Sequence, residues 1–339
     1  MSARAIGRPR RRTARVRGTW AASGISHLDL ENLIVALLAE KGDTWPNALY
    51  ELGYRLHCFD TTLALLEAQG DNRVGCREFA PDAIAIEKRK NRALVFEAKI
   101  GPDVGLKQVP EGLRIPIDEW ARAIGMRVEA LFPPTVQGVL VAPLAVMESK
   151  LDLLTEKRVT LLRVSESFEV DPCFLSDERV KPALEALPAS EWPRSFVPFG
   201  RDPSQNPAKR VVAALAPRIL AAARRGEDRI LAVDLAMATH EAVWKLADAG
   251  TKKGWATIVG GTLKEASAGS LKRIATYVPS PPSLHLQDIV PGRPPGERYM
   301  QELKAALERE QRRRPRRGAQ VPIRRAIGAI PMNLWPDSD

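Results

Sequence analysis

The chain has 339 residues, of which 45% are hydrophobic and 27% are charged, so it is long enough for two ordinary globular domains. Its formal charge of +10 favours an acidic partner such as nucleic acid. The three cysteines (58, 76 and 173) are odd in number and widely spaced, which excludes a disulfide framework and a zinc site built on a CxxC pair. We therefore expect a soluble protein of the reducing cytoplasm.

The positive charge is concentrated near the two ends of the sequence. Residues 1–18 hold seven arginines and no acid, and residues 312–325 hold seven more, again without acid. Subtracting these 14 charges from +10 leaves −4 for the rest. We expect residues 1–25 to be a basic, disordered arm that contacts phosphates, and a disordered arginine-biased tail without that role is the equal alternative. No apolar stretch typical of a signal peptide follows the arm, and no run of residues is long enough to span a membrane.

The first expected element is an amphipathic helix that begins at Ser26 and ends before Gly42, because its leucines and isoleucine recur at helical spacing. A second helical stretch is expected from Pro46 to about Gln69. Two strands, at about 77–87 and 92–100, follow as a hairpin. The next expected elements are a loop over 101–116, a helix near 117–131, and strands at 137–142 and 158–164. This order predicts an α/β domain over residues 26–170, with a sheet flanked by helices.

Seven prolines between residues 171 and 207 oppose regular structure and predict a linker. After it, residues 208–278 are predicted to form a mainly helical domain. Its expected elements are helices at 208–224, 228–236, 239–249 and 262–273, a strand over residues 255–259, and a turn at Gly260-Gly261. A helix-turn-helix or winged-helix module that binds DNA is one interpretation, and a small helical accessory domain is the other. Residues 279–339 are predicted to be a proline-rich segment, a helix at 297–311 and a basic tail.

The hairpin brings three charged residues together. With its turn centred between Arg89 and Lys90, the numbers of paired residues sum to 179. Asp82 then lies opposite Glu97, and Lys99 emerges on the same face because side chains alternate with period two. The neighbouring residues are apolar on both faces, so the sheet is predicted to be internal. The charges are costly to bury there unless they bind something.

A divalent cation is the expected occupant. Mg²⁺ prefers oxygen ligands, so Asp82, Glu97 and the backbone carbonyl of Ala98 are the candidate metal ligands, and Mn²⁺ could substitute. Lys99 could orient the water nucleophile or stabilise the transition state of phosphodiester hydrolysis. The alternative is a surface strand on which the same residues form solvated ion pairs.

Pro81-Asp82, a spacer of fourteen residues, and Glu97-Ala98-Lys99 resemble the signature of the PD-(D/E)xK nuclease superfamily. The resemblance covers residues 27–165. It implies a restriction-endonuclease-like fold, Mg²⁺-dependent cleavage of DNA, and catalytic roles for Asp82, Glu97 and Lys99.

The resemblance also suggests two supplementary residues. Members of the superfamily often add an acid from the first helix, for which Glu31 is the best match and Glu40 and Glu51 compete. They often carry a glutamine after the motif, for which Gln108, beside Lys107, is the candidate. The alternatives are an exposed acid near a helix N-terminus and an ordinary loop residue. The Gln-x-x-x-Tyr motif of the helicase-associated branch does not follow the signature. The four histidines are interpreted as structural or surface residues: His27, His57, His240 and His285.

The sequence therefore predicts a two-domain, cytoplasmic DNA endonuclease, with restriction, phage defence, junction resolution or mobile-element processing as its context. A protein partner subunit or a homodimer is compatible with this prediction, and a membrane is not a predicted partner. One rival is a DNA-binding protein that keeps the nuclease fold without cutting. The other is an interaction subunit that recruits a partner enzyme through its proline-rich segments and tails.

Overall fold

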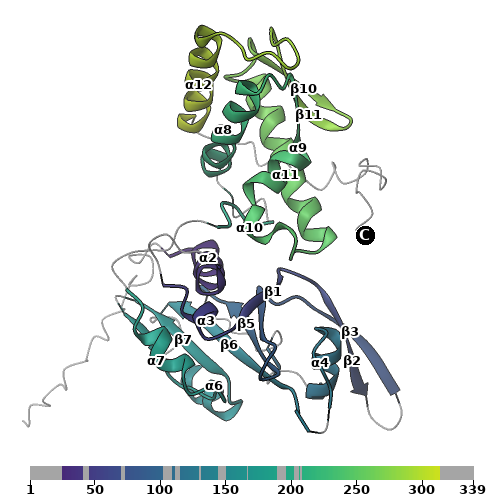
Figure 1. Ribbon diagram of the computed structural model, residues 1–339, viewed down its shortest axis with the longest axis vertical. Helices are drawn as coiled ribbons and strands as arrows, with labels where there is room; N and C mark the ends of the chain where they lie inside the picture. The colour runs from purple at the N-terminus through teal and green to yellow at the C-terminus, as the bar shows by residue number, and fades with distance from the viewer. Residues whose placement is uncertain are drawn as a thin grey trace, which may run out of the picture.

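The protein forms an α/β part and a smaller, mainly helical part, which lie one above the other along the longest axis (Figure 1). The computed structural model describes residues 25–40, 46–69, 73–101, 109–110, 115–129, 131–143, 150–165, 167–188, 196–201, 206 and 208–313. Within these ranges, no helix combines the length and the apolar character needed to cross a membrane.

A six-stranded mixed sheet forms the centre of the first part, in the order β1-β4-β5-β6-β7-β8. Strand β4 runs antiparallel to both β1 and β5, strands β5, β6 and β7 are parallel, and β8 is antiparallel to β7. The strands are β1 (Arg55–Phe59), β4 (Ala83–Glu87), β5 (Arg92–Ala98), β6 (Thr135–Pro143), β7 (Thr160–Val164) and β8 (Phe168–Val170). A mixed sheet flanked by helices confirms the predicted α/β class.

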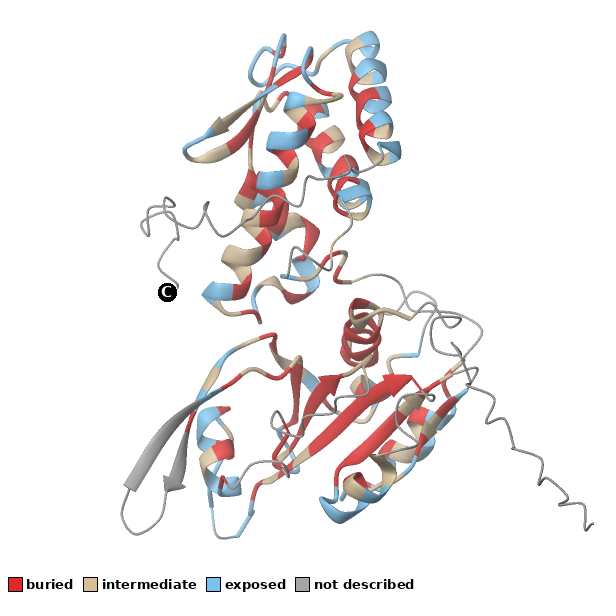
Figure 2. Ribbon diagram, turned by 180° about the vertical axis from the view of Figure 1, so that it is seen from behind, coloured by how far each residue is buried: buried red, intermediate tan, exposed pale blue. Residues whose placement is uncertain are grey.

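Both faces of the β4–β5 hairpin are buried, as predicted, because side chains alternate between two apolar clusters. Ala83 and Phe96 pack toward the cluster that contains helix α2 (His27–Leu38), and Ile84 and Val95 pack toward a second cluster. Helix α4 (Ile117–Ala123) supplies Trp120 to that second cluster, where its ring meets Phe79 edge-on at 4.5 Å between centroids. Figure 2 shows α2 and the central strands as buried.

Helix α2 begins where the sequence predicts. The Ser26 side chain accepts a hydrogen bond from the Asp29 N–H at 3.2 Å, and the Asp29 carboxylate accepts one from the Ser26 N–H at 2.8 Å. This reciprocal cap satisfies backbone donors that have no partner inside the helix. It therefore determines where the first helical turn, with His27 in it, lies.

The predicted helix over residues 46–69 is wrong. Helix α3 (Ala48–Glu51) is one turn long and is followed by Gly53 at φ +99°, a left-handed conformation that ends the helix. The chain then forms β1 and, after a turn, β2 (Leu63–Gln69), which pairs with β3 (Arg73–Phe79). Pairing of β1 with β4 completes the edge of the sheet, and this long-range gain decides against the leucine spacing.

Three smaller differences concern a divided strand, a shorter helix and an additional helix. The strand predicted at 77–87 is two elements, because β3 ends before Pro81, which has no N–H to donate to a ladder. The helix predicted at 117–131 ends at Ala123, close to Gly125 at φ +68°. Helix α6 (Leu151–Glu156), ahead of β7, was not predicted. Strands β6 and β7 match the predicted strands at 137–142 and 158–164 to within two residues.

Regular structure continues into the proline-rich segment at 171–207. Helix α7 (Val180–Glu185) lies there and packs against β8 and α3. Pro182 stands in its first turn, where the missing N–H has no intrahelical partner to lose. Further along, the Asn32 side chain joins the segment to α2: its amide donates to the Val197 carbonyl at 2.8 Å and its carbonyl accepts from the Phe196 N–H at 2.6 Å.

The second part consists of five helices and a small antiparallel sheet of order β10-β11-β9. Its elements are α8 (Ala208–Arg224), β9 (Arg229–Leu231), α9 (Ala232–Thr239), α10 (Glu241–Trp244), α11 (Ala249–Ala268), β10 (Ala275–Pro279), β11 (Pro282–Leu286) and α12 (Glu297–Arg312). The helices predicted at 208–224 and 297–311 are confirmed. The others differ: β9 starts the region predicted as a helix at 228–236, α10 is shorter than predicted, and α11 replaces the helix predicted at 262–273.

The predicted strand over residues 255–259 and the predicted turn at Gly260-Gly261 are both wrong, because they lie inside α11. Trp255 and Val259 stand four residues apart and are both fully buried, so they share the face of α11 that packs into the core. Gly260 lies against Pro282, 3.5 Å from where its Cβ would be.

Candidate functional site

The predicted register of the β4–β5 hairpin is confirmed. Ala83 pairs with Phe96, so each pair of residue numbers sums to 179. Asp82 precedes β4 and Glu97 is the next-to-last residue of β5, so both lie at one edge of the sheet, called the site edge below. The Asp82 Oδ2 accepts a hydrogen bond from the Ala98 N–H at 2.6 Å, which ties the two strands together at this point.

Glu97 and Lys99 form an ion pair through the Glu97 Oε1 and the Lys99 Nζ. Glu97 is only 3% exposed, and its second oxygen, Oε2, is buried with no hydrogen-bond partner among the described residues. The Lys99 backbone N–H donates to the Val141 carbonyl at 2.9 Å, which holds the end of β5 against β6. A buried carboxylate oxygen without a donor is costly, so the site is suited to a positively charged ligand.

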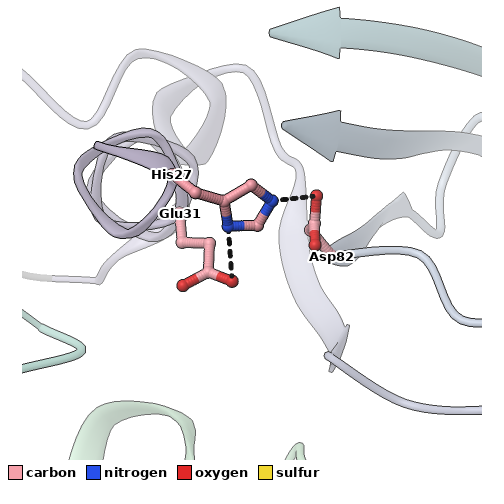
Figure 3. A group of neighbouring side chains, drawn as sticks. All are labelled: His27, Glu31 and Asp82. Carbon is pink, nitrogen blue, oxygen red and sulfur yellow. Dashed lines mark ion pairs between the residues drawn. The ribbon is translucent and has the colours of Figure 1, made fainter. Parts of the chain in front are cut away.

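Helix α2 brings two more residues to the site edge (Figure 3). The His27 imidazole lies between two carboxylates: its Nδ1 is 3.2 Å from the Glu31 Oε1, and its Nε2 is 3.7 Å from the Asp82 Oδ2. His27 and Glu31 are four residues apart and so share one face of the helix. The structure thus brings Glu31, the predicted acid of the first helix, to Asp82 through His27.

The sequence interpretation missed His27. Its spacing of four residues from Glu31 at a helix start was a signal that these two side chains meet, but no local pattern linked them to Asp82. The other histidines lie elsewhere; His240, for example, is fully buried in the second part and stacks on Trp255 at 4.1 Å between centroids.

Burial disfavours the charged carboxylates at the site edge. It raises the pKa of Asp82 to about 6, against the opposing influence of His27. Burial and the neighbouring Asp82 raise the pKa of Glu97 to about 8, although Lys99 acts in the opposite direction. Burial lowers the pKa of His27, but the hydrogen bond to Glu31 and the nearby carboxylates outweigh it and raise that pKa to about 9. The site edge therefore holds protons that a metal cation would displace.

Two overlapping sets of residues have donors that suit a divalent cation. One ligand atom each from His27, Glu31 and Asp82 lie within 4.8 Å of one another. The set expected from the sequence, Asp82, Glu97 and the Ala98 carbonyl, shares Asp82 with it. Carboxylate oxygens suit Mg²⁺, and an imidazole nitrogen is acceptable to Mn²⁺. Together with the buried Glu97 Oε2, this chemistry fits the implied metal. His27 must lose its proton to act as a ligand.

Asp60, which directly follows β1, extends the acidic character of the site edge. Its N–H donates to the Asp82 carbonyl at 2.9 Å, and its carboxylate pairs with the Arg201 Nε at 3.1 Å. Burial raises the pKa of Asp60 to about 7, although Arg201 opposes this change. Asp60 comes from the region predicted as helix, so the sequence interpretation had no reason to select it.

The remaining candidates do not join this group. Glu40 is exposed beyond the end of α2. Glu51 is exposed and lines a surface pocket with Glu87 and Arg89, at the hairpin-turn end of the sheet. Gln108, with Lys107, lies outside the described residues, as do the basic arm and all but the first two arginines of the basic tail.

Comparison with known families finds one similarity. The profile of the MJECL32 domain matches residues 26–111, about a quarter of the chain, and this range contains His27, Glu31, Asp82, Glu97 and Lys99. Neither the curated proteins nor the solved structures contain a match to the chain.

Proposed function

We propose that the protein is a metal-dependent endonuclease that hydrolyses phosphodiester bonds in DNA, with Asp82, Glu97 and Lys99 as its catalytic residues. The observation that carries this proposal is the buried Glu97 carboxylate, which is paired with Lys99 on one oxygen and unsatisfied on the other, beside Asp82. The residues have the spacing of the nuclease signature, and a solvated surface strand would leave no carboxylate oxygen buried without a partner.

Asp82 would bind the metal in either donor set, with Glu97 and the Ala98 carbonyl or with His27 and Glu31. When bound, Mg²⁺ supplies Lewis acidity that makes water a nucleophile near neutral pH and offsets negative charge on the attacked phosphate. The Lys99 ammonium group, held by Glu97, would orient the attacking water or donate to a phosphate oxygen. His27 would hold Asp82 and Glu31 in place, and its imidazole can exchange a proton at Nε2.

The arrangement of elements supports the proposal at the level of fold. Helix α2, the antiparallel hairpin β4–β5, helix α4 and the parallel strand β6 occur in this order in the first part, with α3 and β1 to β3 between α2 and the hairpin, and this order is compatible with a restriction-endonuclease-like core. In the second part, the order α8, β9, α9, α11, β10, β11, with the one-turn helix α10 between α9 and α11, and the antiparallel sheet resemble the topology of a winged helix. We propose these two identities for the parts on topology, with restriction, phage defence or mobile-element processing as the cellular context.

Cleavage assays test this function. The purified full chain is incubated with supercoiled plasmid, linear duplex DNA, single-stranded DNA and RNA, in Mg²⁺, Mn²⁺ or EDTA. We expect metal-dependent cuts in the plasmid that Asp82→Ala and Lys99→Ala abolish, and that Glu51→Ala, an exposed acid outside the site, leaves intact. Metal-dependent cleavage that survives both site substitutions would sink the assignment. DNA binding without cleavage in every metal would favour a non-cutting DNA-binding protein.

A further inference from the structure

The two parts of the protein carry opposite charge. Residues 26–207 contain 21 lysines and arginines and 28 acids, which leaves −7, whereas residues 208–313 contain 18 and 11, which leaves +7. The part with the candidate active site therefore repels a polyanion on average. The positive potential that would hold DNA comes from the second part as well as from the ends of the chain.

Helix α11, the longest in the second part, has one face turned to the core and one turned to solvent. The buried residues of α11 are Thr251, Trp255, Ile258, Val259, Gly260, Leu263 and Ala266. Lys253 and Lys264 lie on the opposite side of the helix axis from most of these residues, and of the buried set only Gly260, which packs against β11, lies near their line. Eleven residues separate them, so they point within about 20° of each other around the helix axis and stand about 16 Å apart along it. The two lysines thus form one stripe on the outside of α11.

The lysine stripe is partly exposed: Lys264 is exposed and Lys253 is half-buried. Thr257, which is half-buried, and Gly261, which is exposed, also stand between the lysines, and apart from the helix's own backbone no atom lies within 4 Å of where a Cβ of Gly261 would be. Arg225, in the same part, pairs with Glu227 at 2.6 Å. By contrast, neither lysine forms an ion pair with a carboxylate of the described residues. Their charge is thus available to a ligand.

Helix α11 starts at the site edge. The Thr251 hydroxyl, in its first turn, donates to the Asp60 carbonyl at 2.6 Å, and the Asp60 N–H donates to the Asp82 carbonyl at 2.9 Å. The Asp248 carboxylate, which caps α11, also accepts from the Thr62 N–H at 2.9 Å. Two hydrogen bonds therefore separate the first turn of α11 from Asp82, and the helix runs from there into the second part (Figure 1).

We propose that the lysine stripe of α11 binds the phosphate backbone of duplex DNA and that the bound duplex extends to the site edge. This inference rests on the proposed function only for what happens at Asp82. An α-helix fits the major groove of duplex DNA, and the bulk of binding affinity comes from phosphates whose counterions are released. In this position the stripe would let the positively charged second part hold a DNA substrate beside the negatively charged first part.

Binding without metal tests the inference separately from cleavage. The anisotropy of a labelled duplex of about 30 base pairs is measured with the full chain in EDTA over a range of salt concentrations. We expect Lys253→Glu with Lys264→Glu to weaken binding at least tenfold and to lower the slope of log K against log salt by about two. The matched control, Lys304→Glu with Arg309→Glu, makes the same charge change at exposed positions of α12 and should weaken binding less than about threefold.

Several outcomes would overturn the inference. Equal losses of DNA affinity in both double variants would mean that DNA is attracted by the overall positive charge and not by the stripe. Unchanged affinity in the stripe variant would show that α11 does not contact DNA. Tighter binding of single-stranded DNA or duplex RNA, or no DNA binding at low salt, would exclude duplex DNA as the ligand; the last result is expected if the face binds an acidic protein.

Two controls keep the result interpretable. Melting temperatures and a Lys253→Gln with Lys264→Gln variant, which should weaken binding in the same direction by a smaller factor, distinguish contact loss from misfolding. If the wild type never cleaves DNA but the stripe variant still loses affinity, the nuclease proposal fails and the binding surface stands.

Discussion

The two ends of the β4–β5 hairpin both carry buried acids, but in opposite electrostatic settings. At the turn end, Asp177 pairs with Arg92 at 3.1 Å and with Arg179 at 2.7 Å, and the hydrogen bond from Arg179 is the main reason that its pKa falls to about 2. At the site edge, burial raises the pKa of Asp82 and of Glu97. One end favours a charged carboxylate and the other favours a protonated one.

The ratio of cations to carboxylates explains this difference. At the turn end two guanidinium groups pair with Asp177, so its burial is compensated within the chain, and the other buried acid there, Glu87, accepts a hydrogen bond from the Lys90 N–H at 2.7 Å. At the site edge four carboxylates, from Glu31, Asp60, Asp82 and Glu97, share Lys99, His27 and Arg201, and one carboxylate oxygen has no partner among the described residues. The cluster around Asp177 has the balance of charge that is typical of a structural ion pair. The second has an excess of negative charge, which is typical of a site that binds a cation.

The largest expected contrast between the two ends is in activity. Asp82→Ala should lower metal-dependent DNA cleavage by roughly 10³-fold, because it removes an acid shared by both donor sets. Asp177→Asn, at the other end of the hairpin, should change cleavage by less than about threefold at a temperature where the variant is folded. Initial rates on supercoiled plasmid measure both. Comparable losses in the two variants would show that burial alone, and not the site edge, determines activity.

The next largest expected effect is on the metal requirement of cleavage, to which His27 contributes. Replacing it with glutamine removes the group that lies between Glu31 and Asp82, so we expect the Mg²⁺ concentration for half-maximal cleavage to rise roughly 10- to 100-fold. A metal titration of the cleavage rate measures this change. His57→Gln, on β1, is the matched control and should leave the titration curve in place. A drop in maximal rate at unchanged metal requirement would give His27 a role in proton transfer instead.

Asp177→Asn should destabilise the fold by about 2 kcal/mol at neutral pH, because it leaves Arg92 and Arg179 without their counter-charge. The folded pKa of Asp177 is lowered, so its stabilising effect is present above the ordinary aspartate pKa of about 4 and is lost as the pH falls toward 2. Urea unfolding at several pH values measures the gap between wild type and variant. A gap that stays constant from pH 7 down to about 2 would contradict the ion-pair assignment.

Glu97→Gln should raise the free energy of unfolding, which is the opposite of the effect of Asp177→Asn, and the change should be smaller. The folded pKa of Glu97 is raised to about 8, so the stabilisation from its protonated form is present at low pH and is lost as the pH rises through that value. In EDTA at pH values above about 8, the neutral glutamine should therefore raise the free energy of unfolding by roughly 1 kcal/mol. Added Mg²⁺ should stabilise the wild type more than the variant, because Glu97 belongs to only one of the two donor sets. Glu51→Gln, at an exposed position, is the control. If Glu97→Gln lowers the free energy of unfolding instead, the site edge does not hold an excess of negative charge.

Local sequence determined the elements whose signals are short in range. The cap at Ser26, helices α8 and α12, and the β4–β5 register depend on residues near one another in the chain, and the register placed Asp82 beside Glu97. Side-chain alternation is periodic in a strand, so it also predicted that both faces of the hairpin are apolar.

Only the tertiary structure decided which distant segments meet. Residues 46–69 and the strand-like residues 255–259 had local patterns that pointed to the wrong element, because partners far along the chain determine whether a segment is buried as helix or strand. The approach of α2 to the sheet added His27 to the site, and packing of α11 against residues 59–62 connected the positive part to Asp82. These are long-range contacts, and no local spacing encodes them.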